Sequence, residues 1–399
     1  MTDATVTLKP GKDGPARAGH PWIFSGAIAE IDGEARAGAF VRVLASGGQV
    51  LGTGTYNPRG SIAVRLLARE EVALDPSFVR HRIADAYALR EAVGITRDNT
   101  AYRLLHGEGD WLPGVVADVY GDFVVLQILT AGAERLRPAI LAALQEVVDP
   151  AGIFERSAGG ARREEGLGDR TDVAQGAAPP AYIEVREGEA RCLVDVRGGQ
   201  KTGFYVDQRD NRALVGRLAG GRDVLNCFAY TGGFAVAAGR GGARRVVSVE
   251  TSGPALQLAR ENWALNGLGD DRAEWLARDV FDVLTPLAGA PEEQRFDVVV
   301  LDPPPFARHR ADRDKAVRAY RDLNRRALRA LRPGGLLATF TCSAHVSREL
   351  FLHAVATSGQ PTMRLQVLAQ LGAPADHPVL AAHPEGEYLS GLLIRVAQG

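Results

Sequence analysis

The second half of the chain has the pattern of a doubly wound α/β domain, in which helices cover both faces of a mostly parallel sheet. From Gly198 onward, short apolar strands alternate with helical patterns, beginning with the strand Asp223–Leu225 and the helix Phe234–Gly239. Glycines, prolines or polar residues follow these strands and end them. Ligands of such sheets bind at the carboxyl ends of the strands, so we expect the functional site at that edge.

Length and composition place the chain among globular proteins of two or three domains. It has 399 residues, of which 46% are hydrophobic and 24% charged, and a net charge of −1. Any nucleic-acid site must therefore be a local basic patch. No apolar run reaches the roughly 18–20 residues that a membrane helix needs, and the N-terminus lacks a signal-peptide core. We therefore expect a cytoplasmic protein without a membrane partner. Three scattered cysteines favour neither a disulfide framework nor a zinc site, and no metal is predicted.

Two smaller domains precede the α/β domain. The first is rich in β-forming residues and glycine, which predicts a small barrel. The second combines a helix that opens at Asp75-Pro76 with two hairpins, and predicts a small α+β unit. Within it, Ser157–Pro180 is rich in glycine, alanine and mixed charge, and is predicted to be a mobile loop. The predicted domains are residues 1–70, 71–197 and 198–399.

The elements of the α/β domain have recognisable ends. The helix Pro254–Asn266 can be capped by Ser252, has proline in its first turn and can stop at Gly267. The tail Tyr388–Val396 is predicted to be a last strand, antiparallel and in the edge region of the sheet. The other predicted elements are helix Asp207–Leu218, strand Val246–Glu250, strand Arg272–Ala277, strand Phe296–Asp302, helix Asp312–Leu331 and strand Leu336–Thr341.

A glycine turn follows the first of these strands and is the first candidate for ligand binding. In Asp223–Phe234, Gly232 and Gly233 let a ligand approach the backbone and begin a helix whose first N–H groups are unpaired. The spacing differs from the G-x-G-x-x-G fingerprint, so a pyrophosphate cradle is poorly supported. Glu250 closes the next strand and is placed to accept hydrogen bonds from ribose hydroxyls. Together these residues favour a nucleoside ligand.

Two further strand ends carry carboxylates. Asp279 could hold an adenine amino group or cap the short helix Val280–Leu284, and the two roles are compatible. Asp302 opens the run Asp302–Phe306, in which three prolines prevent further strand pairing because proline has no N–H. We interpret these prolines as a stiff ledge for a flat base, with Asp302 facing the site. The ledge residues proposed to contact the base are Pro303, Pro304 and Phe306.

The last strand end supplies a thiol. Cys342 follows the strand Leu336–Thr341, and the expected topology puts it at the ligand edge beside Asp302. A thiol at this edge is a candidate nucleophile if its pKa is lowered. Cys192 and Cys227 lie among apolar residues and are predicted to be core side chains.

Taken together, these residues resemble a known family. The second half of the chain is similar to class I S-adenosylmethionine methyltransferases. The whole chain resembles the large-subunit (23S) ribosomal RNA methyltransferase I family, whose members carry a PUA domain. The resemblance implies a Rossmann-like, doubly wound, seven-stranded sheet, an N-terminal PUA β-barrel and S-adenosyl-L-methionine as cofactor. The matching runs are Gly199–Arg212, Cys227–Phe234, Asp302–Phe306, Thr341–Ser343 and Asp376–Leu380.

The resemblance also implies site residues, since Gly199–Arg212 resembles a lid over the cofactor. The expected cofactor-binding residues are Phe204, Tyr205, Asp207, Gly232, Gly233, Glu250, Asp279 and Asp302. Two positions depart from the family pattern. Asn226 stands where many relatives have Asp, and Pro305 stands where many RNA cytosine-C5 methyltransferases have a second cysteine. The group that removes the C5 proton is therefore not assigned.

The implied reaction is formation of 5-methylcytosine in 23S ribosomal RNA. Carbon 5 is too weak a nucleophile to take a methyl group directly, so Cys342 is expected to add at C6 while Asp302 assists at N3. In the helix after the ledge, Arg318 and Arg321 are expected to contact RNA phosphates. The basic candidates in the barrel are Lys12, Arg17, Arg59 and Arg65.

Other functions stay open at this level. The same scaffold supports 5-methyluridine formation and guanine N-methylation, although an amino nitrogen needs no covalent partner such as Cys342. A catalytically silent RNA-binding protein is the alternative from another class. The sequence also leaves open the target cytosine, whether naked RNA or an assembling subunit is the substrate, and the assembly state, including a homodimer.

Overall fold

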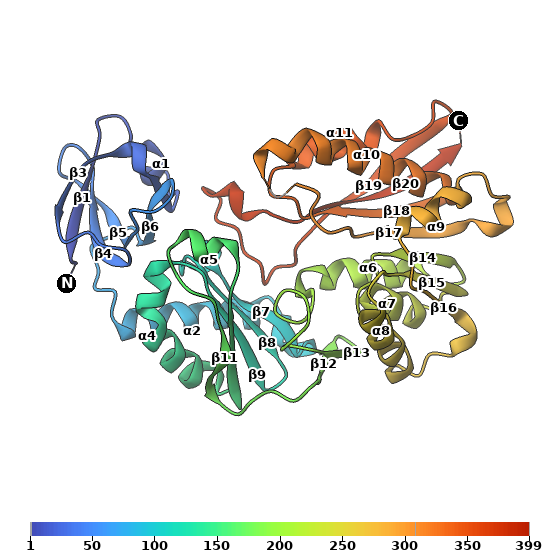
Figure 1. Ribbon diagram of the computed structural model, residues 1–399, viewed down its shortest axis with the longest axis horizontal. Helices are drawn as coiled ribbons and strands as arrows, with labels where there is room; N and C mark the ends of the chain where they lie inside the picture. Colours follow the sequence, from blue (N-terminus) through green and yellow to red (C-terminus); the bar gives the residue numbers. More distant parts are fainter. Residues whose placement is uncertain (1, 308, 399) are drawn as a thin grey trace. The chain divides into compact units, whose positions relative to one another are not determined.

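The chain folds into two compact units in the computed structural model, which describes residues 2–307 and 309–398 (Figure 1). Both units are assembled from separated stretches of sequence, and the predicted three-domain division stays a prediction. No helix in this described part is long and apolar enough to cross a membrane. The first unit comprises residues 1–185, 194–206 and 375–386, and the second comprises residues 186–193, 207–374 and 387–399.

The first unit begins with a six-stranded sheet. Its elements are β1 (Ala4–Leu8), α1 (Gly14–Arg17), β2 (Trp22–Phe24), β3 (Ile28–Gly33), β4 (Ala39–Leu44), β5 (Val50–Tyr56) and β6 (Ile62–Ala68). The strand order is β2-β6-β5-β4-β1-β3, and alternate residues are buried, as Val41 and Val43 are in β4. Glycine is needed in β5, because a Cβ at Gly54 would lie 2.3 Å from the Arg65 carbonyl oxygen. The predicted glycine-rich β domain is confirmed.

A second sheet, of five strands, completes most of this unit. The elements are α2 (Pro76–Ala92), α3 (Ile95–Asp98), β7 (Ala101–His106), β8 (Val115–Tyr120), β9 (Phe123–Ile128), α4 (Ala131–Val148), β10 (Gly152–Ser157), α5 (Gly160–Glu164) and β11 (Arg170–Gly176), with sheet order β11-β10-β9-β8-β7. Ile83 of α2 and Ile140 of α4 share a core with Leu126 of β9. As predicted, α2 begins after Asp75, whose carboxylate accepts a 2.9 Å hydrogen bond from the Phe78 N–H.

The prediction of a mobile loop at Ser157–Pro180 is wrong. The stretch contains α5 and β11, and β11 pairs antiparallel with β10. β11 lies at the sheet edge and none of its residues is fully buried, so the apolar alternation that indicates a strand is missing. The predicted hairpin beyond it forms the two-stranded sheet of β12 (Ile183–Glu187) and β13 (Ala190–Val194).

Residues 375–386 belong to the first unit although they come late in the chain. The Asp376 carbonyl oxygen accepts a 2.8 Å hydrogen bond from Arg90, and the Asp376 carboxylate accepts one of 3.1 Å from the Arg103 N–H. Arg90 is fully buried and also pairs with Asp110 at 2.6 Å. Because buried charges must be paired or hydrogen-bonded, these contacts fix the segment in the core of this unit.

The second unit is built around a seven-stranded sheet. Its strands are β14 (Asp223–Cys227), β15 (Arg245–Val249), β16 (Ala273–Leu276), β17 (Phe296–Leu301), β18 (Leu331–Thr341), β19 (Met363–Gly372) and β20 (Ser390–Gln398). The order is β16-β15-β14-β17-β18-β20-β19; the first five strands are parallel, and β20 runs antiparallel to both of its neighbours. The predicted seven-stranded sheet is confirmed.

Helices cover both faces of this sheet. They are α6 (Arg209–Leu218), α7 (Gly233–Arg240), α8 (Gly253–Leu265), α9 (Val280–Leu287), α10 (Arg313–Arg329) and α11 (Arg348–Ala356). Trp263 of α8 belongs to the core on one face, and Tyr320 of α10 belongs to the core on the other. The expected ends of α8 are present: Ser252 accepts a 3.3 Å hydrogen bond from the Ala255 N–H, and Gly267 has φ +67°. The doubly wound architecture is therefore confirmed.

The end of the chain differs in part from the prediction. β20 is a strand and antiparallel, as expected, but it lies inside the sheet because β19 pairs with its outer side. β19 was not predicted. β19 has a register shift between Val367 and Ala369, and most of its side chains are at least partly exposed, so no apolar alternation marks it.

Candidate functional site

The turn from β14 into α7 has an unusual backbone. Phe228 (φ 59°), Tyr230 (φ 46°) and Gly232 (φ 81°) all have left-handed conformations. Such conformations are strained for residues other than glycine and cluster at functional sites. A Cβ at Gly232 would also lie 2.8 Å from the Ala259 Cβ in α8, so packing as well as φ requires glycine. The turn is thus a rigid feature, with the N-terminus of α7 behind it at Gly233.

Glu250 holds this turn in place. It directly follows β15, and its carboxylate accepts hydrogen bonds from the backbone N–H of Tyr230 at 3.0 Å and of Ser252 at 2.9 Å. Oε1 also accepts a 3.3 Å hydrogen bond from the Thr251 hydroxyl, so Oε2 is the oxygen that has a lone pair left for a ligand hydroxyl. Glu250 therefore has a structural role that sequence reasoning missed, and its predicted role at a ribose is compatible with it.

Buried polar groups without partners adjoin the turn. Asn226 at the end of β14 is 1% exposed, and neither polar atom of its amide has a hydrogen-bond partner among the described residues. The Thr231 hydroxyl is also buried and is likewise unsatisfied within that part of the chain. An unsatisfied buried polar group costs about 1–3 kcal/mol, and groups of this kind indicate a place for a polar ligand.

Asp279 begins helix α9. Its carboxylate accepts a 2.7 Å hydrogen bond from the Phe281 N–H, and its side chain is exposed. The helix-cap role is therefore present. Contact with an adenine amino group stays a prediction.

The proline ledge and the end of β18 are tied together by one hydroxyl. Ser343 Oγ accepts hydrogen bonds from the N–H of Phe306 at 3.0 Å and of Ala307 at 3.4 Å, and shares one of 2.9 Å with the Tyr320 hydroxyl. The hydroxyl is buried, so each of these bonds forms away from competing water. Sequence reasoning missed Ser343 as a positioning residue; its place directly after Cys342 was the available signal.

Cys342 lies against this ledge. Its Sγ is 3.9 Å from the Pro303 carbonyl oxygen, and its side chain is partly exposed. Cys192 and Cys227 are buried, and burial raises the pKa of Cys192 to about 12 and also raises the pKa of the Cys227 thiol. Both stay protonated at neutral pH and are poor nucleophiles. Among the three cysteines, only Cys342 combines access to solvent with a position beside Asp302 and the ledge.

The run expected to form a lid is divided between the two units. Phe204 and Tyr205 belong to the first unit, where Phe204 is buried and its N–H donates to the Tyr120 hydroxyl at 3.3 Å. The Tyr205 hydroxyl donates to Gln200. Asp207 belongs to the second unit and accepts a 2.6 Å hydrogen bond from the Tyr388 hydroxyl. The lid role of these residues stays a prediction.

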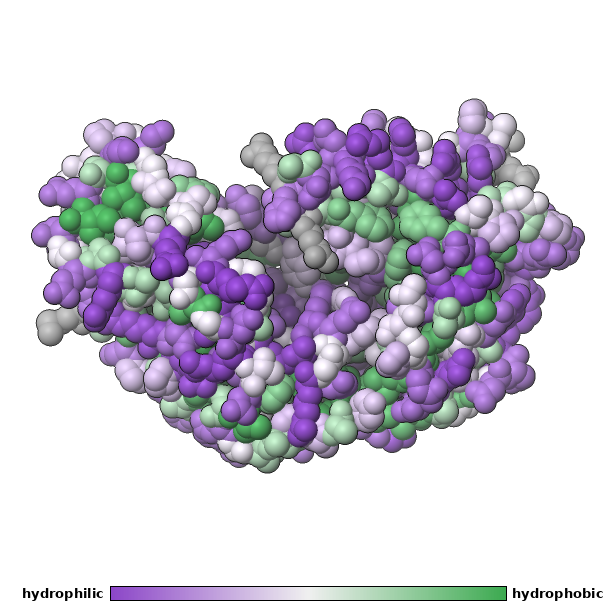
Figure 2. Space-filling model, viewed as in Figure 1, coloured by the Kyte–Doolittle hydropathy of each residue, from purple (hydrophilic) through white to green (hydrophobic). Residues whose placement is uncertain are grey.

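Helix α10 presents basic side chains to solvent. Arg325 and Arg326 both pair with Asp322. Arg318 and Arg321 are exposed, and neither has an ion pair with another residue of the described part. Figure 2 shows hydrophilic residues gathered over α10 and α11. Arg318 and Arg321 are thus available for an anionic partner.

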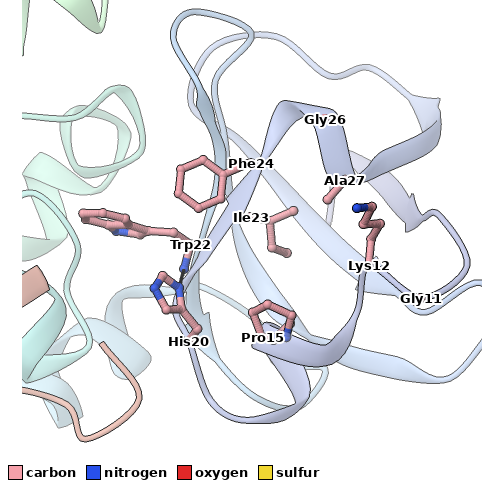
Figure 3. A pocket seen from close by; sticks show the side chains of 10 residues that line it. Gly11, Lys12, Pro15, His20, Trp22, Ile23, Phe24, Gly26 and Ala27 are labelled. Atoms are coloured by element: carbon pink, nitrogen blue, oxygen red, sulfur yellow. Dashed lines mark hydrogen bonds between the residues drawn. The ribbon is translucent and has the colours of Figure 1, made fainter. Parts of the chain in front are cut away.

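The β-rich domain has a pocket that sequence reasoning did not predict. Its volume is about 590 Å³, and it is lined by Lys12, Trp22, Ile23 and Phe24 among others. Phe24 is 47% exposed, and Figure 3 shows Ile23 between Phe24 and Lys12. Exposed aromatic rings near a cation suit unpaired bases and phosphates. By contrast, two of the predicted phosphate contacts already have acidic partners: Arg65 pairs with Glu165 at 2.7 Å, and Arg17 pairs with Asp13.

Comparison with known proteins identifies both parts of the chain. Residues 103–390 match the S-adenosylmethionine-dependent methyltransferase family, and residues 6–69 match a PUA-like domain. The chain is 41% identical over 402 residues to ribosomal RNA large subunit methyltransferase I of Klebsiella pneumoniae, covering 99% of this chain and 100% of the relative. Its identity to the protein of the same name from Alteromonas mediterranea is 40% over 395 residues, covering 98% and 99% of the two chains.

Solved structures have the same fold. The crystal structure of SMU.776 complexed with SAH superposes with a TM-score of 0.85 at 24% identity, covering 98% of this chain and 100% of that one. A Streptococcus mutans protein described as SAM-dependent gives a TM-score of 0.83 at 23% identity, with the same coverage. At these identities the similarity establishes the fold alone.

The residues around the glycine turn fit S-adenosylmethionine, the cofactor of this family. The unsatisfied amide of Asn226 and the hydroxyl of Thr231 offer buried polar partners. Glu250 offers carboxylate oxygens, and the start of α7 offers backbone N–H groups. The left-handed turn joins β14 to α7, and Glu250 at the end of β15 is hydrogen-bonded to it.

Replacing Glu250 by Ala should weaken binding of S-adenosylmethionine. The loss of a charged hydrogen bond costs about 1.5–3 kcal/mol, which corresponds to about a tenfold or greater rise in Kd. Calorimetric titration of the folded variant measures this change. Glu274→Ala is the matched control, because it removes only an exposed ion pair with Arg245 in the same sheet. An unchanged Kd for Glu250→Ala would remove this residue from the site.

Replacing Ser343 by Ala should loosen the ledge. The N–H groups of Phe306 and Ala307 and the Tyr320 hydroxyl lose their shared partner, which should lower the free energy of unfolding by about 1–3 kcal/mol. We expect kcat for methyl transfer to fall while the Kd of S-adenosylmethionine is unchanged. Ser347→Ala is the control, since it removes only the cap of α11. If kcat fell equally in both variants, the loss would come from lower stability of the protein and not from the ledge.

Proposed function

Because this chain belongs to the ribosomal RNA large subunit methyltransferase I family, we propose that it methylates carbon 5 of a cytosine in 23S ribosomal RNA. When bound, S-adenosylmethionine supplies an electrophilic methyl group on a positively charged sulfur. The observation that carries the choice of cytosine C5 is the position of Cys342, a partly exposed thiol 3.9 Å from the proline ledge.

The chemistry of carbon 5 explains why a thiol is needed. In our proposal the Cys342 thiolate adds to C6, and the new S–C6 bond pushes the ring electrons toward C5 and N3. Asp302 shares a proton with N3 and stabilises the charge that develops there. After C5 has taken the methyl group, a base that is not assigned here takes the C5 proton, and the C–H electron pair forms the C5=C6 double bond. The S–C6 bond then breaks and the thiolate is released.

The ledge prepares the base for this addition. Directly after β17, Pro304 is exposed and Phe306 is partly exposed, whereas Pro303 is buried, and Ser343 fixes this run to the strand end that carries Cys342. A base must leave its stack to reach such a site, and a flat wall compensates part of the lost stacking. Ser343 acts here as a positioning residue, because it holds the ledge rather than contacting the base.

The RNA contacts that we propose lie on two surfaces. Arg318 and Arg321 are exposed on α10, close in sequence to the ledge. The PUA-like domain adds the pocket that contains Trp22, Phe24 and Lys12. Phosphate contacts give affinity that depends on salt, whereas aromatic rings hold unpaired bases.

Replacing Cys342 by Ala should abolish methyl transfer while leaving the Kd of S-adenosylmethionine almost unchanged, because the thiol contacts the base and not the cofactor. RNA that carries 5-fluorocytosine at the target should form a stable adduct with the native protein, since fluorine blocks the final elimination. Denaturing gel electrophoresis would detect the adduct, and mapping of 5-methylcytosine in rRNA from cells with and without the protein locates the target.

Cys227→Ala is the matched control, because this thiol is buried and should not take part in the adduct. The adduct should persist in this variant and disappear in Cys342→Ala. Methylation of cytosine by Cys342→Ala at a near-native rate would refute the covalent mechanism. An adduct with 5-fluorouridine instead would favour the 5-methyluridine alternative, and methylated guanine without any adduct would favour amino methylation.

Neutralising Arg318 and Arg321 by glutamine should weaken RNA binding. Each lost phosphate contact should lower the slope of log affinity against log salt by up to about one unit. Filter binding at several salt concentrations measures the slope. Arg325→Gln is the control on the same helix, since Arg325 already pairs with Asp322. Slopes that are equal for all three variants and the native protein would mean that these arginines are ordinary solvated charges.

A further inference from the structure

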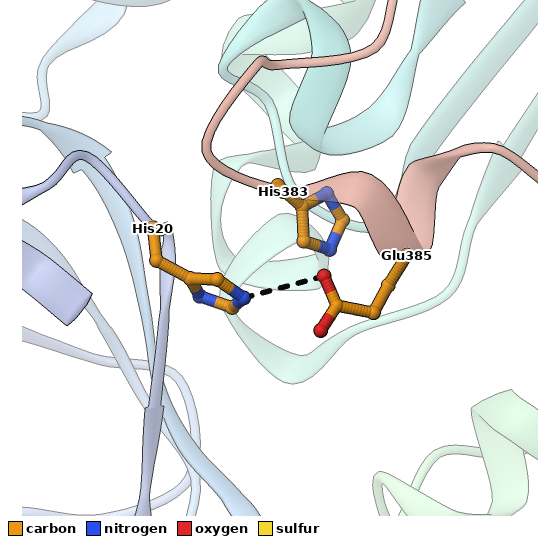
Figure 4. A group of neighbouring side chains, drawn as sticks. All are labelled: His20, His383 and Glu385. Atoms are coloured by element: carbon orange, nitrogen blue, oxygen red, sulfur yellow. Dashed lines mark ion pairs between the residues drawn. The ribbon is translucent and has the colours of Figure 1, made fainter.

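Two histidines and a glutamate meet in the first unit, outside the site described above. His20 directly precedes Pro21 and β2, whereas His383 and Glu385 lie together at a short turn in residues 375–386. Figure 4 shows the three side chains turned toward one another. One ligand atom from each lies within 4.8 Å of the others, and His20 Nε2 is 3.4 Å from Glu385 Oε2. Histidine and glutamate are common ligands of transition metals.

His383 carries an unsatisfied nitrogen at this place. The residue is 3% exposed, and its Nε2 has no hydrogen-bond partner among the described residues. In Figure 4 a nitrogen of its ring faces Glu385. Burial lowers the pKa of His383, because the charged form of the ring loses its hydration there. A buried nitrogen of this kind is costly unless a ligand satisfies it.

We propose that His20, His383 and Glu385 form a Zn²⁺ site, with a water molecule as the fourth ligand. Zinc in proteins is bound tetrahedrally, with Zn–N and Zn–O distances of about 2.0–2.2 Å, which places neighbouring ligand atoms about 3.4 Å apart. The separation between His20 Nε2 and Glu385 Oε2 has this value. The number and spacing of the cysteines predict no metal, but they say nothing of histidines and a carboxylate from distant parts of the chain.

Two pockets border histidines of the cluster. His20 lines the pocket of about 590 Å³ in the PUA-like domain. His383 lines a second pocket, of about 160 Å³, together with His106 and Glu108. An ion can therefore enter without unfolding of the segment, and the fourth coordination position has room for water.

The hydrogen bonds of His20 set the expected strength of binding. Its Nδ1 accepts a 3.1 Å hydrogen bond from the Trp22 N–H, so without metal the ring proton is on Nε2 and faces Glu385. Coordination through Nε2 requires this proton to move to Nδ1, and the Trp22 contact is then lost. We therefore expect zinc affinity in the micromolar range, below that of preorganised structural sites.

The consequence of metal binding would be structural. Zinc would cross-link residues 375–386 to the start of β2, two stretches that otherwise meet through the His20–Glu385 pair and the T-shaped contact of the Trp22 and His383 rings, whose centroids are 4.4 Å apart. The site is independent of the proposed methyl transfer. Its test can succeed or fail whatever the outcome for Cys342.

Titration of the full-length protein with zinc chloride tests the proposal. After treatment with EDTA and dialysis, calorimetry should show one site per chain with a Kd of about 10 µM or tighter. Glu385→Gln and His20→Ala should weaken it by about 100-fold, as loss of a ligand does. His345→Ala removes an exposed histidine of the second unit and should leave the Kd for zinc unchanged. Zinc should also raise the Tm of the native protein and not that of Glu385→Gln.

Two results would overturn the proposal. One is the absence of saturable zinc binding at concentrations up to about 1 mM. The other is equal affinity in the native protein, Glu385→Gln and His20→Ala, which would place the bound zinc elsewhere, for example at Cys342. His383→Ala removes a buried ring and could fail to fold, whereas the Glu385 carboxylate is 50% exposed and its amide variant keeps the size of the side chain.

Discussion

The parallel alignment of β15, β14, β17 and β18 is the constraint on which the candidate site depends. Leu301 pairs with Cys227 on one side and with Thr339 on the other, so these strands end at the same edge. Glu250 and Asp302 each directly follow one of them. Residues that are far apart in the sequence therefore share one edge because their strands point the same way. No single loop has to supply the whole site.

Two local devices make this edge rigid. The Glu250 carboxylate accepts a hydrogen bond from the Tyr230 N–H and so supports a turn that contains left-handed non-glycine residues. The strain of such residues costs about 1–3 kcal/mol each. The buried Ser343 hydroxyl is hydrogen-bonded to the N–H groups of Phe306 and Ala307 and to the Tyr320 hydroxyl, and so fixes the segment that follows the prolines. In both cases a side chain next to the chemistry also stabilises the fold. Loss of activity in a variant therefore needs a separate measurement of cofactor binding or stability before it is interpreted.

Sequence reasoning located features that depend on local pattern and missed those that depend on distant contacts. Spacing and residue type predict the strand ends, the helix caps Asp75 and Ser252, and the glycine turn. The structure has all of these features. Strand β11 was missed because an edge strand needs no buried face. The pairing of Arg65 with Glu165 could not be predicted, since the two residues are 100 positions apart. Ser343 is marked in the sequence only by its place in the run Thr341–Ser343, because one hydroxyl carries no periodicity.

The interleaving of the two units has a consequence for synthesis of the protein. The buried Arg90 guanidinium donates to a carbonyl oxygen 286 residues further along the chain, at Asp376. The core of the first unit is thus incomplete until nearly all of the chain has left the ribosome, whereas α2, which carries Arg90, emerges early. In a partly finished chain Arg90 would have Asp110 as its partner but would lack the acceptor at Asp376, and the apolar surface around this place would be exposed. The N-terminal part of the first unit would then stay partly folded until synthesis is nearly complete, and chaperones and proteases can act on it in this state.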